Sequence, residues 1–158
     1  MHSLIIQLQN EIDPNNIISE SDYNFDEPSG DLCPFADYYS SINERHRRQI
    51  LDELSLHGIA INGDTFTITD KSVYFKDYYI NFKKNLKLLS SVNEDDFISD
   101  NYTVDGNMHS LNKEYNDRYG IYVDDKGDYF SMTTLARFLR HYNNGDTFQI
   151  GGLVDYHC

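Results

Sequence analysis

The first 44 residues contain no lysine and no arginine, although they hold nine of the 26 acidic residues of this chain. Basic residues begin at Arg45, and a second acidic region follows at 92–128, where ten acids accompany three bases. The 158 residues together carry a formal net charge of −13. We name residues 1–44 and 92–128 the two acidic blocks. A surface of this sign repels phosphate groups, so we expect no direct binding to nucleic acid.

Cysteine is also scarce. Cys33 and Cys158 are the only two, and neither belongs to a Cys-x-x-Cys pair. This count excludes a disulfide scaffold, and we expect two free thiols. The N-terminal residues lack a basic segment followed by a long apolar run, and no stretch reaches the roughly 18 to 20 apolar residues of a membrane span. We therefore expect a cytoplasmic protein without a membrane partner.

Motifs for catalysis, cofactors and metals are missing as well. The chain has no GxSxG, no P-loop and no GxGxxG, and its six histidines form no HxxxH, HExxH or HxH pair. The acid-rich turn at 124–128 lacks calcium-loop spacing, because Lys126 occupies a ligand position. We expect no cofactor, no metal and no enzymatic activity. A carboxylate-dependent enzyme stays open as an alternative, since paired acids cannot be picked out among 26.

Composition favours a single folded domain over residues 1–158, because 39% hydrophobic and 14% aromatic residues exceed what a disordered chain of this charge carries. Periodic segments predict the order β-α-β-β-α-α-β-β-α-β, which is an α+β fold with a mainly antiparallel sheet and about four helices. Residues 10–34 contain Pro14, Pro28 and Gly30 and are expected to form a long acidic loop.

Local signals give the element boundaries. Strands are predicted at 3–9, 59–61, 65–69, 121–123, 129–132 and 147–156, and helices at 41–57, 70–92, 105–119 and 133–142, with a short helical turn at 93–99. Ser41 and Glu44 match a capping box, Asp105 is the expected N-cap of its helix, and Gly58 is the expected stop after the first helix. Asn62-Gly63 predicts a type I′ hairpin turn. Gly151-Gly152 predicts a bulge or a close approach of another backbone.

The segment at 70–92 is the longest with one clear period. A helix here places aromatic and leucine side chains on one face, opposite four lysines, and Asp70 is its expected N-cap. An aromatic stripe of this kind can line a ligand site, but we expect it to fill the core, because burying a Phe or Leu contributes about 1.5 to 3 kcal/mol. The stripe consists of Phe75, Tyr78, Tyr79, Phe82, Leu86 and Leu89.

One basic cluster, Arg45-His46-Arg47-Arg48, lies at the start of a predicted helix that a hairpin follows. That order resembles the end of a winged-helix motif, which would present these residues to DNA. The net charge opposes this alternative. We favour pairing of these arginines with the acidic N-terminal block.

The acidic blocks, together with the missing catalytic motifs, predict a non-enzymatic acidic binding protein. Duplex DNA presents about one negative charge per 1.7 Å, and a rigid array of carboxylates can occupy the same cationic channel in a partner. We expect an inhibitor of a basic nucleic-acid-binding enzyme or toxin. It would be a nucleic-acid mimic or an immunity protein, of a kind that phages and mobile elements encode.

Contact residues are predicted in both blocks. Alternatives are that the acids only keep the protein in solution, or that Tyr-rich faces make it a self-assembling structural or regulatory module. Aromatic side chains beside charges are common interface anchors, which selects two further residues in the loop. The predicted set is Asp22, Tyr23, Phe25, Asp26, Glu27 and Asp31 in the loop, and Glu94, Asp95 and Asp96 before Phe97.

Overall fold

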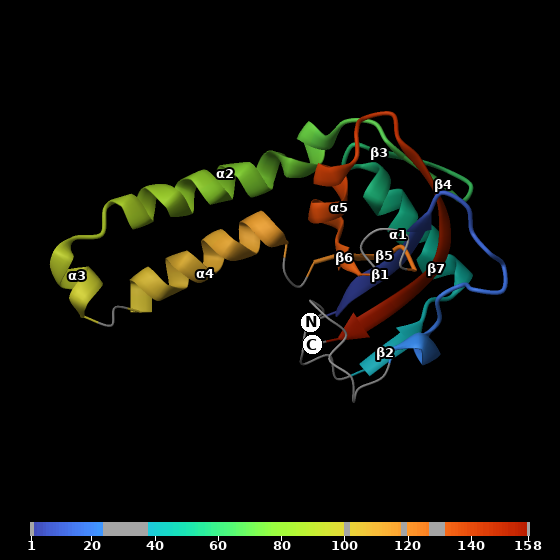
Figure 1. Cartoon of the computed structure of the whole chain (residues 1–158), viewed down its shortest axis with the longest axis horizontal. Helices are drawn as coiled ribbons and strands as arrows, with labels where there is room; N and C mark the ends of the chain where they lie inside the picture. The colour runs from blue at the N-terminus through green and yellow to red at the C-terminus, as the bar shows by residue number, and fades with distance from the viewer. Residues whose placement is uncertain (1, 24–37, 100–101, 118–119, 127–131, 158) are drawn as a thin grey trace.

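The computed structural model of the chain describes residues 2–23, 38–99, 102–117, 120–126 and 132–157. These residues form one sheet of seven strands together with five α-helices, which confirms the predicted α+β class (Figure 1). The strands are β1 (His2–Gln9), β2 (Tyr38–Ser41), β3 (Ile59–Asn62), β4 (Thr65–Ile68), β5 (Tyr122–Asp124), β6 (Thr133–Thr134) and β7 (Thr147–His157). The helices are α1 (Glu44–Ser55), α2 (Lys71–Ser90), α3 (Glu94–Ile98), α4 (Tyr102–Asn116) and α5 (Leu135–His141), with a 3₁₀ turn η1 (Glu20–Asp22).

The two longest strands, β1 and β7, lie at the centre of the sheet. The strand order is β3-β4-β7-β1-β5-β6, and β2 pairs with residues 154–157 of β7. Pairing between the described strands is antiparallel except for β1 with β5, which run parallel. The predicted mainly antiparallel sheet is therefore confirmed.

Alternate residues of β1 enter two separate hydrophobic clusters, as the period of a strand requires. Leu4, Ile6 and Leu8 belong to the larger cluster, which also contains the buried side chains of α1 and α5. Ile5 belongs to the smaller cluster. That cluster also contains Ile18, from the segment after β1, and buried residues of β5 and β7. Helices thus cover one face of the sheet, and the segment after β1 covers part of the other.

Gln7 of β1 explains the Gly151-Gly152 sequence of β7. Its side chain is fully buried, and its Oε1 accepts hydrogen bonds from the backbone N–H groups of Ile18 and Gly152, both at 3.0 Å. The register of the two strands shifts at this point. A Cβ atom on Gly151 would lie 2.1 Å from Oε1 of Gln7. The predicted bulge and close approach are therefore confirmed, although a side chain makes the approach at Gly151.

The start of α1 differs from the prediction. Asn43 is the N-cap, because its Oδ1 accepts from the N–H of His46 at 3.0 Å. Ser41 instead ends β2, a strand that the sequence did not predict, and its N–H donates to Oε2 of Glu20 at 2.7 Å. The capping box at Ser41 is thus wrong, because the polar residue two positions later takes that role.

The hairpin of β3 and β4 is confirmed, but its turn lies one residue later than predicted. Asn62 pairs with Thr65, so Gly63 and Asp64 form the loop. Gly63 has a φ of +60°, whereas Asp64 is not among the described residues with positive φ. The turn is therefore not type I′, which requires positive φ at both central residues.

Later boundaries also shift by a few residues. Helix α4 begins at Tyr102, one turn before the predicted cap at Asp105, and it ends at Asn116. Thr134 caps α5, because its Oγ1 accepts from the N–H of Arg137. Most of the predicted strand 129–132 falls outside the described residues, as do residues 24–34 of the predicted loop and both cysteines.

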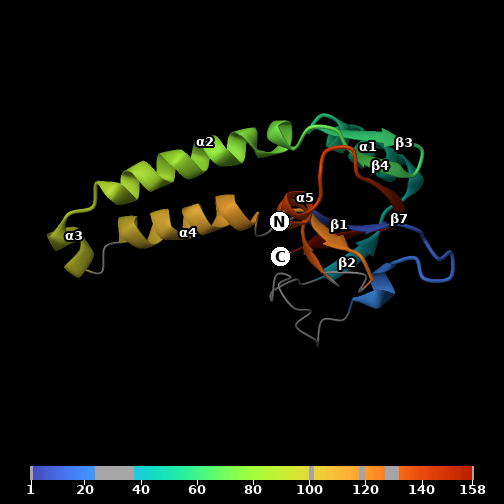
Figure 2. The ribbon, with the colours of Figure 1, turned by 45° about the horizontal axis from the view of Figure 1, so that its top comes forward.

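Helix α2 has the predicted N-cap, since Oδ1 of Asp70 accepts from the N–H of Ser72 at 2.9 Å. The prediction that its aromatic face fills the core is wrong for most of its length. Tyr74 is the one buried residue of α2, whereas Tyr79 is 63% and Leu86 is 43% exposed. Figures 1 and 2 show why, because α2 leaves the sheet and projects outward with α4 beside it.

Candidate functional site: a two-helix arm

The helices α2, α3 and α4 form a projection that we name the arm. The chain runs outward along α2, turns at α3 and returns along α4, so that α3 lies at the end farthest from the sheet (Figures 1 and 2). With 20 residues at about 1.5 Å each, α2 alone spans about 30 Å. None of the helices in the described part of the chain combines the length and apolar character needed to cross a membrane.

The far end of the arm combines carboxylates with exposed apolar side chains. Glu94, Asp95 and Asp96 occupy the first turn of α3, where the helix dipole favours negative charge. Their turn is capped by Asn93, whose Oδ1 accepts from the N–H of Asp96 at 2.8 Å. Phe97 is 79% exposed. Ile98 and Tyr102 are exposed as well, and we name these three residues together with the three acids the tip.

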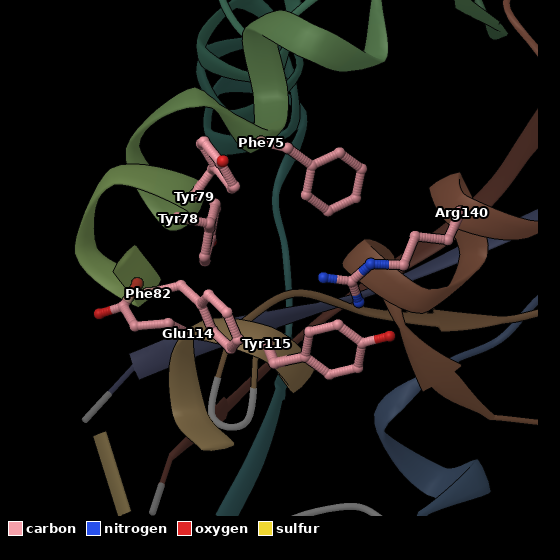
Figure 3. Close-up of a pocket in the computed structure, with 7 residues that line it drawn as sticks. All are labelled: Phe75, Tyr78, Tyr79, Phe82, Glu114, Tyr115 and Arg140. Carbon is pink, nitrogen blue, oxygen red and sulfur yellow. The ribbon is translucent and has the colours of Figure 1, made fainter. Parts of the chain in front are cut away.

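Where the arm joins the body of the protein, α2, α4 and α5 enclose a pocket of about 320 Å³, which we name the base pocket (Figure 3). Most of its lining is aromatic. The guanidinium of Arg140 reaches it from α5, with its Cζ 4.8 Å from the ring centroid of Phe75 and 4.3 Å from that of Tyr115. The lining residues are Phe75, Tyr78, Tyr79, Phe82, Glu114, Tyr115 and Arg140.

A buried carboxylate lies beside this pocket. Asp117 follows the last residue of α4 with a φ of +53°, and its two oxygens accept hydrogen bonds of 2.9 Å from the hydroxyls of Tyr74 and Tyr78. Burial raises the pKa of Asp117, although the two tyrosines and the charge of Arg140 act in the opposite direction. Burial, followed by the nearby carboxylate, raises the pKa of both tyrosines. These bonds tie α2 to the end of α4.

The loop residues predicted as contacts are only partly described. Tyr23 is 7% exposed, and its hydroxyl donates to Oδ2 of Asp124 at 2.7 Å, so the expectation that it is an exposed anchor is wrong. Burial raises its pKa, and the charge of Asp124 adds to that effect. The remaining loop residues, Phe25, Asp26, Glu27 and Asp31, lie outside the described residues.

Asp22 is exposed but already has protein partners. It accepts from the N–H of Ser19 at 2.7 Å and pairs with Nζ of Lys126 at 3.2 Å. Burial acts to raise the pKa of Asp22, but the hydrogen bonds from Ser19 and Lys126 outweigh it and lower the pKa overall. Asp22 lies in η1, which contacts β2, whereas Glu94, Asp95 and Asp96 lie in α3 at the far end of the arm, so the structure does not bring them together (Figure 1).

Of the basic cluster in α1, Arg47 contacts the sheet and the hairpin loop. Its guanidinium pairs with Asp64 at 2.7 Å and donates to the carbonyl oxygen of Gly151 at 2.8 Å. Arg47 thus pairs outside the acidic N-terminal block, contrary to expectation. The hairpin that follows α1 belongs to the sheet, because its strand β4 pairs with β7.

No family model, no curated protein and no solved structure matches this chain. Within the residues that the structure describes, no group of three or more His, Cys, Asp or Glu side chains is arranged to hold a metal ion. We take the arm as the candidate functional site, because it has exposed apolar side chains beside three acids at its far end and an aromatic pocket at its base. The aromatic stripe signalled the pocket in the sequence, but neither Arg140 nor Asp117 belonged to any motif.

Proposed function

We propose that this chain is a non-enzymatic, cytoplasmic acidic protein that binds a basic partner through the tip and blocks it. The observation that carries the proposal is the placement of Glu94, Asp95 and Asp96 next to the exposed side chain of Phe97, at the far end of the arm. Interfaces of this kind combine an apolar anchor with charges that steer the encounter. A basic nucleic-acid-binding enzyme or toxin fits best, because its cationic channel attracts a protein of charge −13.

The shape of the arm supports insertion into a groove. Two packed helices hold α3 away from the sheet, so the tip can enter a channel that excludes the rest of the protein (Figure 2). Lys76, Lys83, Lys84 and Lys87 make the flank of α2 basic, and the last three lie in the outer half of the helix, close to the tip. The three acids of the tip are grouped in the first turn of α3. A cationic partner should therefore contact the first turn of α3 rather than the flank of α2.

Affinity capture with a charge-matched control tests the proposal. One variant replaces the tip acids (Glu94→Gln, Asp95→Asn, Asp96→Asn), and the control replaces three exposed acids elsewhere (Glu11→Gln, Asp52→Asn, Glu53→Gln). The unchanged chain and the control should capture the same basic protein at low salt and release it at high salt. The tip variant should not capture this protein even at low salt.

Capture must also be followed by loss of the partner's activity on nucleic acid when the purified chain is added. If no basic protein is captured, or if the control variant weakens capture as much as the tip variant does, the proposed function is wrong. Equal weakening would show that net charge alone governs the interaction.

A self-assembling module is the second candidate, and one observation favours it. The basic flank of α2 also carries exposed apolar residues, Ile80 and Leu88 among them, which complement the acidic tip of a second copy. Sedimentation separates the two candidates. An inhibitor stays monomeric without its partner, whereas a self-assembling module forms oligomers that the tip variant dissociates.

A further inference from the structure

The base pocket offers aromatic surface that the protein itself does not cover. Tyr79 and Tyr115 are both more than half exposed, although they line a pocket of about 320 Å³. Phe82 lies beside Tyr115, with the ring centroids 6.1 Å apart. Ligand pockets span roughly 300 to 1,000 Å³ and are mostly apolar, so this one has room for a single small ring with a short substituent.

The inner wall of the pocket is already ordered. The ring of Tyr78 stacks on that of Tyr74, with the centroids 5.4 Å and the planes 15° apart, and both hydroxyls donate to the carboxylate of Asp117. A ligand that packs against this wall does not have to order these side chains on binding, which lowers the entropic cost of association.

Arg140 has partners for its charge within the protein. Its Cζ lies 4.8 Å from the ring centroid of Phe75 and 4.3 Å from that of Tyr115. Its charge also stabilises the ionised form of the buried carboxylate of Asp117. The guanidinium therefore forms one wall of the pocket, and a ligand needs no anionic group to balance it.

Glu114 is the charge that has no partner. It lines the pocket from α4, and it makes no hydrogen bond or ion pair within the described part of the chain. Figure 3 shows it across the pocket from Arg140. Arg140, Asp117 and Glu114 together bring one positive and two negative charges to this region, so one negative charge stays unbalanced. A ligand with one positive charge complements the pocket.

We infer that the base pocket binds a free arylalkylamine, which is a small aromatic ring joined by a short chain to an ammonium group. The ring packs among Tyr79, Phe82 and Tyr115. The ammonium group pairs with Glu114, on the side of the pocket away from Arg140, and neighbouring ring faces add to the attraction for a cation. This site lies at the opposite end of the arm from the tip, so it does not depend on the proposed function.

Four probes test the inference on the unchanged protein by NMR titration of its aromatic resonances. 2-Phenylethylamine carries the ring and the ammonium group, 2-phenylethanol lacks the charge, butylamine lacks the ring, and 3-phenylpropanoate carries the opposite charge. 2-Phenylethylamine should bind at least about tenfold more tightly than each of the other three, because hydrogen bonds to charged groups are the stronger ones. The inference is overturned if 2-phenylethylamine causes no shifts at millimolar concentration, or if any other probe binds as tightly.

A matched pair of substitutions separates Glu114 from the net charge of the protein. Glu114→Gln should weaken 2-phenylethylamine about tenfold and leave 2-phenylethanol unchanged, which also shows that the variant folds. Asp77→Asn removes the same charge from an exposed position of α2 outside the pocket lining, and it should leave both affinities unchanged. Equal weakening by the two variants would overturn the assignment.

A second pair places the ring of the ligand. Tyr79→Ala removes an exposed wall and should weaken 2-phenylethylamine and 2-phenylethanol about two- to tenfold each. Met108→Ala is the control, because Met108 is exposed and lines a second hollow of the arm that shares Phe82 and Tyr115 with the base pocket. Weakening by Met108→Ala but not by Tyr79→Ala would put the ring in that second hollow and overturn the inference.

Discussion

The hydroxyl of Tyr78 donates a hydrogen bond to Oδ1 of Asp117 across 2.9 Å, and this contact joins α2 to the residue that follows α4. The second oxygen of the same carboxylate accepts from Tyr74. Two residues that are 39 positions apart in the chain thus tie α2 to the end of α4 at the base of the arm.

Removing one of these tyrosine hydroxyls should lower the stability of the folded protein. Tyr78→Phe leaves one oxygen of the buried carboxylate without its donor, so we expect the free energy of unfolding to fall by about 1 to 3 kcal/mol. Tyr79→Phe is the matched control, because Tyr79 is the next residue of α2 and is 63% exposed. The control should change stability by less than about 0.5 kcal/mol. Urea denaturation measures both, and equal effects would contradict a special role for Tyr78.

Asp117 should also make stability depend on pH. Because burial raises its pKa in the folded protein, the unfolded chain releases this proton at a lower pH than the folded one. The contribution of Asp117 to stability is therefore complete below the ordinary pKa of aspartate, and it is lost as the pH rises through the raised value.

Asp117→Asn removes the titration while keeping a side chain that tolerates positive φ. The difference in unfolding free energy between the unchanged protein and Asp117→Asn should change between the ordinary pKa of aspartate and the raised pKa of Asp117. Above the raised pKa this difference should be constant. A difference that stays flat through the acid range would show that the carboxyl group is not perturbed.

Two glycines should respond in opposite ways to the same substitution. In Gly152→Ala the new Cβ would lie 2.2 Å from the carbonyl oxygen of Ile18, and backbone cannot move aside cheaply, so we expect a loss of more than about 2 kcal/mol. Gly106 lies within α4, and a methyl group added there would meet no neighbouring side chain or element within 4 Å. Gly106→Ala should therefore stabilise the protein by up to about 1 kcal/mol. Thermal and urea unfolding of both variants check the contrast.

The sequence predicts features that depend on near neighbours in the chain. The hairpin of β3 and β4 and the cap at Asp70 rest on residue types whose backbone preferences are local, and the structure confirms them. The glycine pair at 151–152 predicts a close approach, but not that Gln7, far away in the chain, makes it. Strand β2 was missed because four residues carry little periodic signal, and its pairing with the far end of β7 joins positions more than a hundred residues apart.

The sequence could not predict that α2 belongs to an arm. A helical period shows which residues of α2 share a face, but it does not show what covers that face. The same aromatic stripe is compatible with a core and with a partner helix that leaves half of it exposed. Arg140 and Asp117 could not be assigned either, because each acquires its role only when α2, α4 and α5 come together.

The tip offers the sharpest separation between stability and function. Phe97 is 79% exposed, so Phe97→Ala removes no core contact and should change the unfolding free energy by less than about 0.5 kcal/mol. If Phe97 anchors the interface, the same change should weaken capture of the basic partner at least about tenfold, because truncation of a hot-spot anchor costs about 2 kcal/mol or more. Leu56→Ala is the control, since Leu56 is 74% exposed just after α1, away from the arm. Equal binding by both variants would exclude Phe97 as an anchor, whereas a loss confined to Phe97→Ala would show that the apolar part of the tip, and not its charge alone, holds the partner.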